Sequence, residues 1–529
     1  MNYKKLAAAV AATALVVGAL LGGAGSASAA SGDAYQPEFA SIDPNSQILY
    51  VLNDKAGNDA TGVATEIPPE KQTANHEGWK WCTSLSDTNC DFKNSTLAIQ
   101  GNAVLQNCAN TVSDFCLESL ELAAPNSDFK PATFVREANQ PVWAPDKALG
   151  FPGGSGPSLY TSADAPTAGG QNTYAVRVTL KISFNRSTGK FDTNALAAAV
   201  VPYRTVNDPN VFGLAGSGTG LGQVCGWIEP GVCGVTQDWV PGTKARISVK
   251  VPSNLAGWFK GRIQSPQISI NAVNASTNRL VVEAEPAVVP QMAIAKPLSY
   301  WEEQRQLGND IGWWGGPGFK ETGTGSGDSG VDKFIDRFRT ELKDTATGLS
   351  SMWNFATVNA GNGSQCLQDS SRVLGIVTTN AMGYDGSSPS FENGMLSYHV
   401  SGLHYAPDGT TLNEGTYDLV MRSDAARCLY GFTKAPISAT VSVISASGDL
   451  KTAVTTVNEK DGWLTMRAYG FTFSNPVVNV KITQAKDPSA SSTSSGSSTG
   501  SSTITCVKGK LTKKVSGTAP KCPAGYKKK

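Results

Sequence analysis

Histidine is scarce in this chain of 529 residues, and long apolar runs are almost absent. With three histidines and no Cys-x-x-Cys pair, the sequence lacks the ligand clusters of a zinc centre, so no metal and no cofactor is expected. After residues 1–29, no run approaches the ~20 consecutive apolar residues of a membrane-spanning helix. We therefore expect a mature chain without a transmembrane segment, and no pattern predicts a nucleic-acid partner.

Residues 1–29 have the three parts of a secretory signal peptide. Lys4 and Lys5 form the charged start, and residues 6–21 supply the apolar stretch. Ala27-Ser28-Ala29 is the small-residue cleavage site, which favours removal of the segment over its retention as an anchor. The mature protein is therefore expected to be secreted, either extracellular or associated with the cell wall.

Ten cysteines in an exported chain are expected to form disulfides before they serve as metal ligands or nucleophiles. Pairing them in sequence order gives five bridges with no thiol left over. Spacing alone leaves three pairings open for the first four cysteines. The candidates are Cys82, Cys90, Cys108, Cys116, Cys225, Cys233, Cys366, Cys428, Cys506 and Cys522.

Short runs in which apolar and polar residues alternate dominate the middle of the chain, and Gly and Pro punctuate them. A period of two suits strands with one buried face. The sequence therefore predicts a mainly β, multidomain protein with an antiparallel β-sandwich (Ig-like) architecture. The predicted strands lie at 174–184, 245–251, 280–284, 439–444 and 477–482.

The mature chain is too long for a single hydrophobic core, so several domains are expected. Shifts in composition suggest the boundaries. The predicted parts are a signal peptide (1–29), a disulfide-containing β-rich region that is open to division near 165 (30–295), an Ig-like sandwich with one helix (296–487), a Ser/Thr/Gly linker (488–503) and a Lys-rich stapled tail (504–529).

The spacing of Leu412, Gly415 and Tyr417 is similar to the tyrosine corner of Greek-key sandwiches, where a phenol hydroxyl ties a crossing loop to the sheet. We expect a strand at 417–421 and a Cys366–Cys428 bridge between the two sheets. The Tyr-x-Cys and core Trp of antibody-type domains are missing. The pattern therefore favours sandwiches in general and indicates no function.

One amphipathic helix is predicted near 330–345. Its apolar stripe has the i, i+3, i+4, i+7 and i+11 spacing of a single helical face. Such a stripe serves as a binding surface in some proteins, but we expect it to pack on its own domain. The stripe consists of Val331, Phe334, Ile335, Phe338 and Leu342.

Sequence signals for catalysis are weak. Gly327-Asp328-Ser329-Gly330 resembles the nucleophile loop of chymotrypsin-like serine proteases, and the stretch ending at His76 resembles their histidine loop. The Gly-Gly that follows the serine in that family is absent here, and Ser329 precedes the predicted helix. We therefore interpret Ser329 as a helix N-cap and assign no catalytic residue.

Two further motifs are given structural interpretations. His399 and His404 are five residues apart, which on an extended strand puts them on opposite faces, so a shared metal is not expected. The default for each is an exposed or hydrogen-bonded histidine. The glycine-rich segment 218–222 precedes no helix, and a dinucleotide site is therefore not expected.

Aromatic residues concentrate between 300 and 319. Tyr300, Trp301, Trp313 and Trp314 are candidates for stacking on the sugar rings of a glycan. The alternative is that they fill a core or a domain junction, as aromatic residues in sandwiches more often do.

The last 24 residues carry eight lysines, two cysteines and no acidic residue. The body between leader and tail has 34 basic and 43 acidic residues, a formal charge of −9 against +8 on the tail. Two strand-like runs flank a Lys508-Gly509 turn, which predicts a hairpin. A Cys506–Cys522 bridge would close it and stabilise it by about 3 kcal/mol. The lysines are Lys508, Lys510, Lys513, Lys514, Lys521, Lys527, Lys528 and Lys529.

A tethered hairpin that displays lysines predicts a polyanionic partner: anionic cell-wall polymers, acidic glycans or anionic lipid headgroups. The alternative is a solubilising tail, but solubility does not require paired cysteines. Residues 488–503 supply the tether, a flexible linker with a root-mean-square span of about 20 to 24 Å.

The tail resembles a C-terminal signature on diverse exported proteins of high-GC Gram-positive bacteria. The resemblance rests on Ile504-Thr-Cys506-Val-Lys-Gly-Lys and Pro520-Lys-Cys522-Pro-Ala-Gly-Tyr526. The segment from Gly415 to Phe432, which includes Cys428, also resembles uncharacterised exported proteins of such bacteria. These resemblances imply export and carry over no catalytic residue.

Two hypotheses follow for function. The first is an exported, non-enzymatic protein of the cell surface or wall, with a binding, structural or adhesive role and a cationic tail for polyanionic wall polymers. The second is a secreted hydrolase of wall or extracellular polymers that uses the tail as a targeting module.

Overall fold

The computed structural model describes residues 31–35, 46–52, 60–66, 79–88, 90–92, 97–138, 140–207, 225–297, 299–300, 303, 321–325, 331–358, 364–431, 437–444, 450–451, 454–473, 477–484, 502–509, 511–517, 521–523 and 525–529. The chain divides into two compact units. The body comprises the described residues up to 431 and from 438 to 483, and the tail unit includes those from 502 onward. The predicted signal peptide and the predicted linker up to residue 501 lie outside the described residues.

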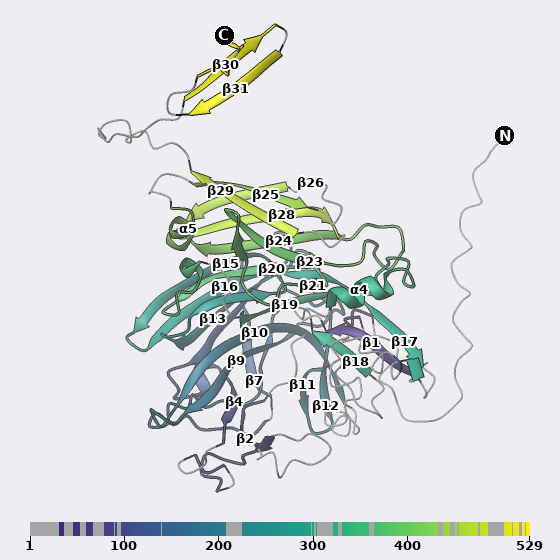
Figure 1. The fold of residues 1–529 in the computed structure, drawn as a ribbon. Helices are drawn as coiled ribbons and strands as arrows, with labels where there is room; N and C mark the ends of the chain where they lie inside the picture. The colour runs from purple at the N-terminus through teal and green to yellow at the C-terminus, as the bar shows by residue number, and fades with distance from the viewer. Residues whose placement is uncertain are drawn as a thin grey trace, which may run out of the picture. The chain divides into compact units, whose positions relative to one another are not determined.

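The body is mainly β, as predicted. Its largest element is a closed, branched network of strands joined by ladder hydrogen bonds, and the long curved strands of this network are visible in Figure 1. It contains β2 (Gly62–Glu66), β3 (Trp79–Trp81), β4 (Ile99–Val104), β5 (Cys116–Ala123), β6 (Lys130–Pro131), β7 (Thr133–Glu137), β8 (Ser158–Thr161), β9 (Thr173–Asn185), β10 (Lys190–Asn207), β11 (Cys225–Glu229), β12 (Val232–Thr236), β13 (Lys244–Pro252), β14 (Gly257–Gly261), β15 (Ile263–Asn274), β16 (Thr277–Gln291), β19 (Gly348–Val358), β20 (Val373–Thr379), β24 (Glu414–Arg422), β27 (Val454–Lys460) and β28 (Trp463–Thr472).

Alternation in the sequence translates directly into burial in β13. Ala245, Ile247, Val249 and Val251 are all at most 1% exposed and belong to the main core, while the residues between them are partly exposed. Each buried Ile or Val side chain of this kind contributes roughly 1.5–3 kcal/mol to folding. The five strands predicted from alternation are all present, within β9, β13, β16, β25 and β29.

Strand β9 departs from the expected one-sided burial. Residues 174–180 are buried on both faces, including Arg177 and Thr179. One face joins the main core, and on the other Ala175 packs in a second cluster with Tyr203 and Trp227. The hairpin of β11 and β12 pairs with β10 and brings Trp227 over this face, so tertiary packing overrides the amphipathic pattern.

A smaller sheet covers the β20–β24–β28–β27 part of the network and makes a two-layer sandwich. It contains β21 (Gly383–Tyr384), β22 (Ser390–Glu392), β23 (Met395–Ser401), β29 (Val477–Gln484), β25 (Ile437–Ile444) and β26 (Leu450–Lys451). Tyr398 and Tyr417 face each other between the layers, both fully buried, with ring centroids 5.6 Å apart. The sandwich expected in the second half of the chain is therefore present.

The boundary expected between residues 295 and 296 does not divide the body into separate units. β16 pairs with β19, and β14 pairs with both β19 and β20, so strands from both sides of the boundary share one hydrogen-bonded network. All of them belong to one compact unit. The reason is physical: a strand that finds its neighbour across a sequence boundary removes two exposed sheet edges at once.

Tyr417 does not form the tyrosine corner suggested by its spacing. It is fully buried, and its hydroxyl makes no hydrogen bond within the described part of the chain. The Cys366–Cys428 bridge likewise does not span the two sheets. It joins the 3-10 helix η3 (Gln365–Leu367) to helix α5 (Ser423–Tyr430), because both cysteines lie in short helical segments beside the sandwich.

The amphipathic helix forms as α4 (Val331–Arg339) and packs on its own body, as expected. Ile335 and Phe338 are at most 1% exposed, and they pack with Met292, Met382 and Leu403, with Leu342 at the edge of this cluster. Beside α4, Figure 1 shows a small sheet in the order β17-β1-β18. Its strands are β17 (Ala293–Pro297), β1 (Ser46–Leu52) and β18 (Glu321–Gly325).

Five disulfides form, and the pairing follows sequence order. This resolves the alternatives left open for the first four cysteines: Cys82 pairs with Cys90, and Cys108 with Cys116. The second bridge closes a turn that contains the 3-10 helix η2 (Cys108–Asn110). No described cysteine is free, which suggests an oxidising, extracellular kind of environment.

Candidate functional site

The tail unit is a three-stranded antiparallel sheet in the order β31-β30-β32. Its strands are β30 (Ser502–Lys508), β31 (Leu511–Gly517) and the short β32 (Lys527–Lys528). Gly509, with a φ of 60°, turns the chain between the first two strands. This conformation suits glycine because it has no Cβ to clash. The predicted hairpin is confirmed, with a third strand added by the last residues.

The disulfide Cys506–Cys522 closes this sheet. Cys506 is completely buried, although so few residues cannot build a conventional core. Lys513 and Lys528 lie directly opposite Cys506 on its two neighbouring strands, so their side chains share its face. We call this face of the sheet the cystine face.

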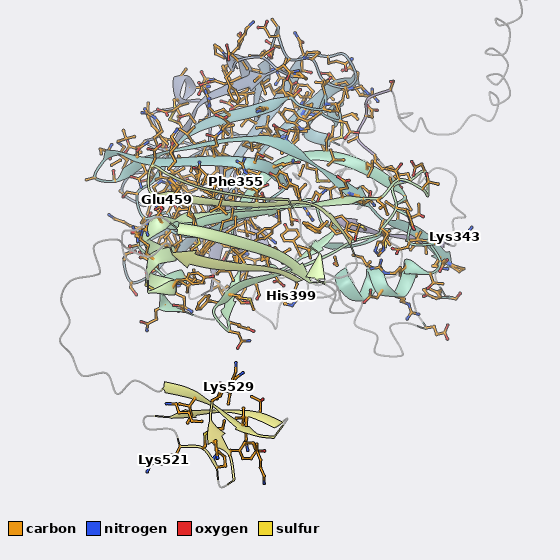
Figure 2. The ribbon with its side chains drawn as sticks, turned by 90° about the horizontal axis from the view of Figure 1, so that it is seen from above. Lys343, Phe355, His399, Glu459, Lys521 and Lys529 are labelled. Atoms are coloured by element: carbon orange, nitrogen blue, oxygen red, sulfur yellow. A yellow bond between two sulfur atoms is a disulfide. The ribbon has the colours of Figure 1, made fainter. Side chains whose placement is uncertain are left out.

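The opposite face carries lysines as well. Thr505 is opposite Lys514, and Val507 is opposite Lys527, so both lysines project from the face that Cys506 does not occupy. We call it the threonine face. The side chains of Lys508, Lys513, Lys514, Lys521, Lys527, Lys528 and Lys529 are all exposed, while Lys510 lies outside the described residues. Figure 2 labels Lys521 and Lys529 on different sides of the unit.

Positive charge therefore surrounds the tail unit instead of forming one patch. No acidic side chain occurs in residues 502–529, so no side chain of this segment neutralises the ammonium groups. A surface of this kind attracts polyanions from any direction, and the attraction weakens with salt because exposed charges are screened. An arrangement of exposed ammonium groups of this kind is suited to binding anionic groups.

Removal of the tail disulfide is expected to unfold the tail unit and leave the body intact. In Cys506→Ser/Cys522→Ser, the loss of a cross-link over 16 residues costs about 3 kcal/mol, more than a hairpin of this size retains. Backbone amide signals of 502–529 in an NMR spectrum of the full chain should collapse to random-coil positions. Dispersed tail signals in the double variant, with body signals unchanged, would contradict the stapling role.

Of the aromatic candidates for glycan stacking, Tyr300 is the one that the structure describes. Its ring lies close to two cations: Lys296 Nζ is 5.5 Å and the guanidinium of Arg337 5.7 Å from the ring centroid. Its hydroxyl accepts a hydrogen bond from Arg337 Nε at 3.0 Å. The ring also packs against the α4 cluster, a geometry typical of a packing residue. Trp301, Trp313 and Trp314 lie outside the described residues.

The two described histidines each contact an aspartate. His399 Nδ1 lies 3.1 Å from Asp385, and His404 Nδ1 lies 2.5 Å from Asp344. They are hydrogen-bonded, as expected, and β23 ends before His404. Among the described residues no cluster of side chains suits a metal ion, and no helix there is long and apolar enough to cross a membrane. Ser329, His76 and the glycines at 218–222 lie outside those residues.

A buried polar cluster in the body was not anticipated from the sequence. Asp418 of β24 is completely buried and accepts hydrogen bonds from the Tyr469 hydroxyl at 2.7 Å and the Ser265 amide at 3.1 Å. Arg467 Nε lies 3.2 Å from the same carboxylate. Burial raises the pKa of Asp418 to about 6, and the hydrogen bonds and Arg467 only partly offset it.

Ser265 takes part in the cluster through an unusual backbone conformation. Its φ is 54°, in the left-handed region, at a bulge between Gln264 and Gln267 in β15. The bulge turns its amide toward Asp418 and sets its hydroxyl 2.9 Å from the Tyr469 hydroxyl. Because the carboxyl group has no exposed surface, this geometry is that of a structural joint between β15 and β24.

Two exposed tryptophans were also missed by the sequence analysis, Trp79 and Trp81 in β3. The signal was available: Trp-Lys-Trp places two indoles two residues apart, on one face of a strand. The protein has 11 tryptophans, and which of them are exposed depends on contacts between distant strands.

Neither protein-family models nor curated proteins contain a match to this chain.

Proposed function

We propose that this is an exported, non-enzymatic protein of the cell surface or wall, held there by a cationic tail unit that binds polyanionic wall polymers. The observation that carries the proposal is the disulfide-closed tail sheet with exposed lysines on both faces and no acidic side chain. The leader sequence and the five disulfides support an exported location.

Electrostatics supports a contact role for the tail. The body is acidic overall, so it would be repelled by an anionic wall without a basic attachment. A lysine near an anionic surface contributes about 1 kcal/mol at physiological salt, which makes several lysines on one small unit sufficient for retention. A closed sheet also loses less conformational entropy on binding than a flexible lysine tail would.

The test compares full-length protein with a truncation before Ile504 on isolated cell walls. Low salt should retain the full-length protein, and the truncation should wash off. Walls from which the anionic polymers have been extracted should lose most of this difference. Retention that is equal for both forms, or that survives about 1 M salt, where charges are screened within ~3 Å, contradicts the proposal.

Face-specific variants resolve how the tail binds. Lys513→Gln/Lys528→Gln removes two charges from the cystine face, and Lys514→Gln/Lys527→Gln removes two from the threonine face. Each pair should weaken binding by roughly tenfold or more, given about 1 kcal/mol per lysine. The matched control, Lys147→Gln/Lys343→Gln, removes two exposed body lysines and should leave wall binding unchanged.

A further inference from the structure

The outer face of the sheet formed by β3, β2, β4 and β9 carries two exposed tryptophans. Trp81 is 64% exposed and Trp79 37%. Each of the other described tryptophans is buried, with at most 9% of its surface exposed. They lie two residues apart on one strand, so their indoles share a face. Val63, Ile99 and Ile182, on the alternate positions, fill the main core from the inner face.

Small residues under Trp81 let its ring lie against the sheet. A Cβ at Gly62 would come within 2.9 Å of Cζ3 of Trp81, so the ring rests where a larger residue would project. Ala64, directly opposite Trp81 in register, is only 5% exposed. One side of the indole is therefore supported by the sheet, and the other is presented to solvent.

Polar side chains continue the same face beyond the tryptophans. In register, Ala64 is opposite Gln100, and Gln100 is opposite Ser183. In the neighbouring row, Asn102 is opposite Lys181. Since adjacent strands are about 4.8 Å apart, the row from Trp81 to Ser183 spans about 14 Å. Figure 1 shows β2, β4 and β9 together in the lower part of the body.

We propose that this face, the Trp79/Trp81 face, binds a neutral carbohydrate chain. A supported aromatic ring matches the apolar C–H side of a sugar, and amide and hydroxyl side chains match its hydroxyl groups as both donors and acceptors. The tryptophans are too few, and their polar neighbours too close, for the continuous apolar area of a membrane or protein contact. The charged side chains on this face balance, Glu66 and Asp192 against Lys181 and Lys190, so a polyanion gains no net attraction there.

The test titrates the full-length protein with chitotetraose, cellotetraose and maltotetraose while tryptophan fluorescence and heat of binding are followed. At least one oligosaccharide should bind with a Kd of ~1 mM or tighter. Trp81→Ala should weaken that binding roughly tenfold or more. Gln100→Ala should weaken it less, and Trp81→Phe should retain part of it.

Two variants test positioning and folding. Gly62→Val should displace the ring and weaken binding while both tryptophans remain, and Val112→Ala, a change at an exposed apolar side chain outside this face, should have no effect. Thermal unfolding of each variant shows whether the fold is retained. Absence of binding by all three sugars, or binding unchanged in Trp81→Ala, overturns the proposal.

This site is independent of the tail. The truncation before Ile504 should keep oligosaccharide binding and lose wall retention at low salt. Trp81→Ala should lose oligosaccharide binding and keep wall retention. Loss of both activities in Trp81→Ala with the fold intact would mean that the two sites are one, which contradicts the inference.

Discussion

Replacement of Arg262 by alanine is expected to destabilise the body by about 4 kcal/mol. The side chain is completely buried between β14 and β15. Its Nη1 donates to the carbonyls of Thr379, at 3.0 Å, and Ala381, and Nη2 donates to that of Met382 at 3.2 Å. The substitution leaves a cavity and three buried carbonyl groups without their donors.

Loss of the Arg262 side chain should destabilise both layers of the sandwich. The guanidinium holds the chain where it passes from β20 to β21, and it lies 4.3 Å from the ring centroid of Tyr384. Arg262→Lys should recover only part of the loss, because an ammonium is a single point donor and cannot span three carbonyls as a planar guanidinium does.

Urea unfolding of the protein with its disulfides intact measures this loss of stability. The matched control is Arg279→Ala, which removes an exposed arginine paired with Glu118 and should cost far less, because exposed ion pairs add little to stability. Equal midpoints for Arg262→Ala and Arg279→Ala would show that the buried guanidinium does not hold the layers together.

The contribution of Asp418 to the stability of the body should fall as pH rises from about 4 to about 6. Its pKa is raised from 3.8 in the unfolded chain to about 6 in the fold, so the folded state binds more protons in this window. The stabilisation is therefore complete below pH 4 and lost as pH rises through 6. This difference in pKa between the folded and unfolded states corresponds to ~3 kcal/mol of stability.

Asp418→Asn should remove this dependence, since the amide does not titrate. The measurement is the difference in unfolding free energy between variant and parent at pH 4.5, 5.5 and 7.5, which cancels other titrating groups. Between pH 4.5 and 7.5, the unfolding free energy of Asp418→Asn should rise relative to that of the parent by about 2 kcal/mol or more. Asp461→Asn, at an exposed turn, gives the effect of net charge alone. A constant difference for Asp418→Asn would contradict the raised pKa.

Local patterns predicted the elements of the fold well. Alternation at Ala245–Val251 predicted β13, and the stripe through Ile335 and Phe338 predicted α4, because both periods are set by backbone geometry. Pairing in sequence order was one of the arrangements that the cysteine spacing left open, and it is the one that forms. Four of the five bridges close loops of at most 16 residues in sequence.

Long-range pairing could not be predicted in the same way. The pairing of β14 with β20 joins the two sides of the expected domain boundary. These strands lie more than 100 residues apart in the sequence, so no local pattern indicates that they are neighbours. The suggested tyrosine corner failed for a related reason: Tyr417 has the spacing, but its ring packs against Tyr398 and its hydroxyl has no hydrogen-bond partner among the described residues. Spacing describes one strand and contains no information on what covers it.

The candidate sites likewise differ in whether local sequence or long-range contacts form them. The tail was readable because its charge, cysteines and turn all lie within residues 504–529, and local chemistry decides their arrangement. The sequence by itself determined the strand-rich class and the basic tail, and it predicts an export signal that stays a prediction. Only the tertiary structure decided which tryptophans reach solvent, that Asp418 is buried, and that lysines occupy both faces of the tail. Exposure and register are properties of contacts between segments, and no single segment of the chain encodes them.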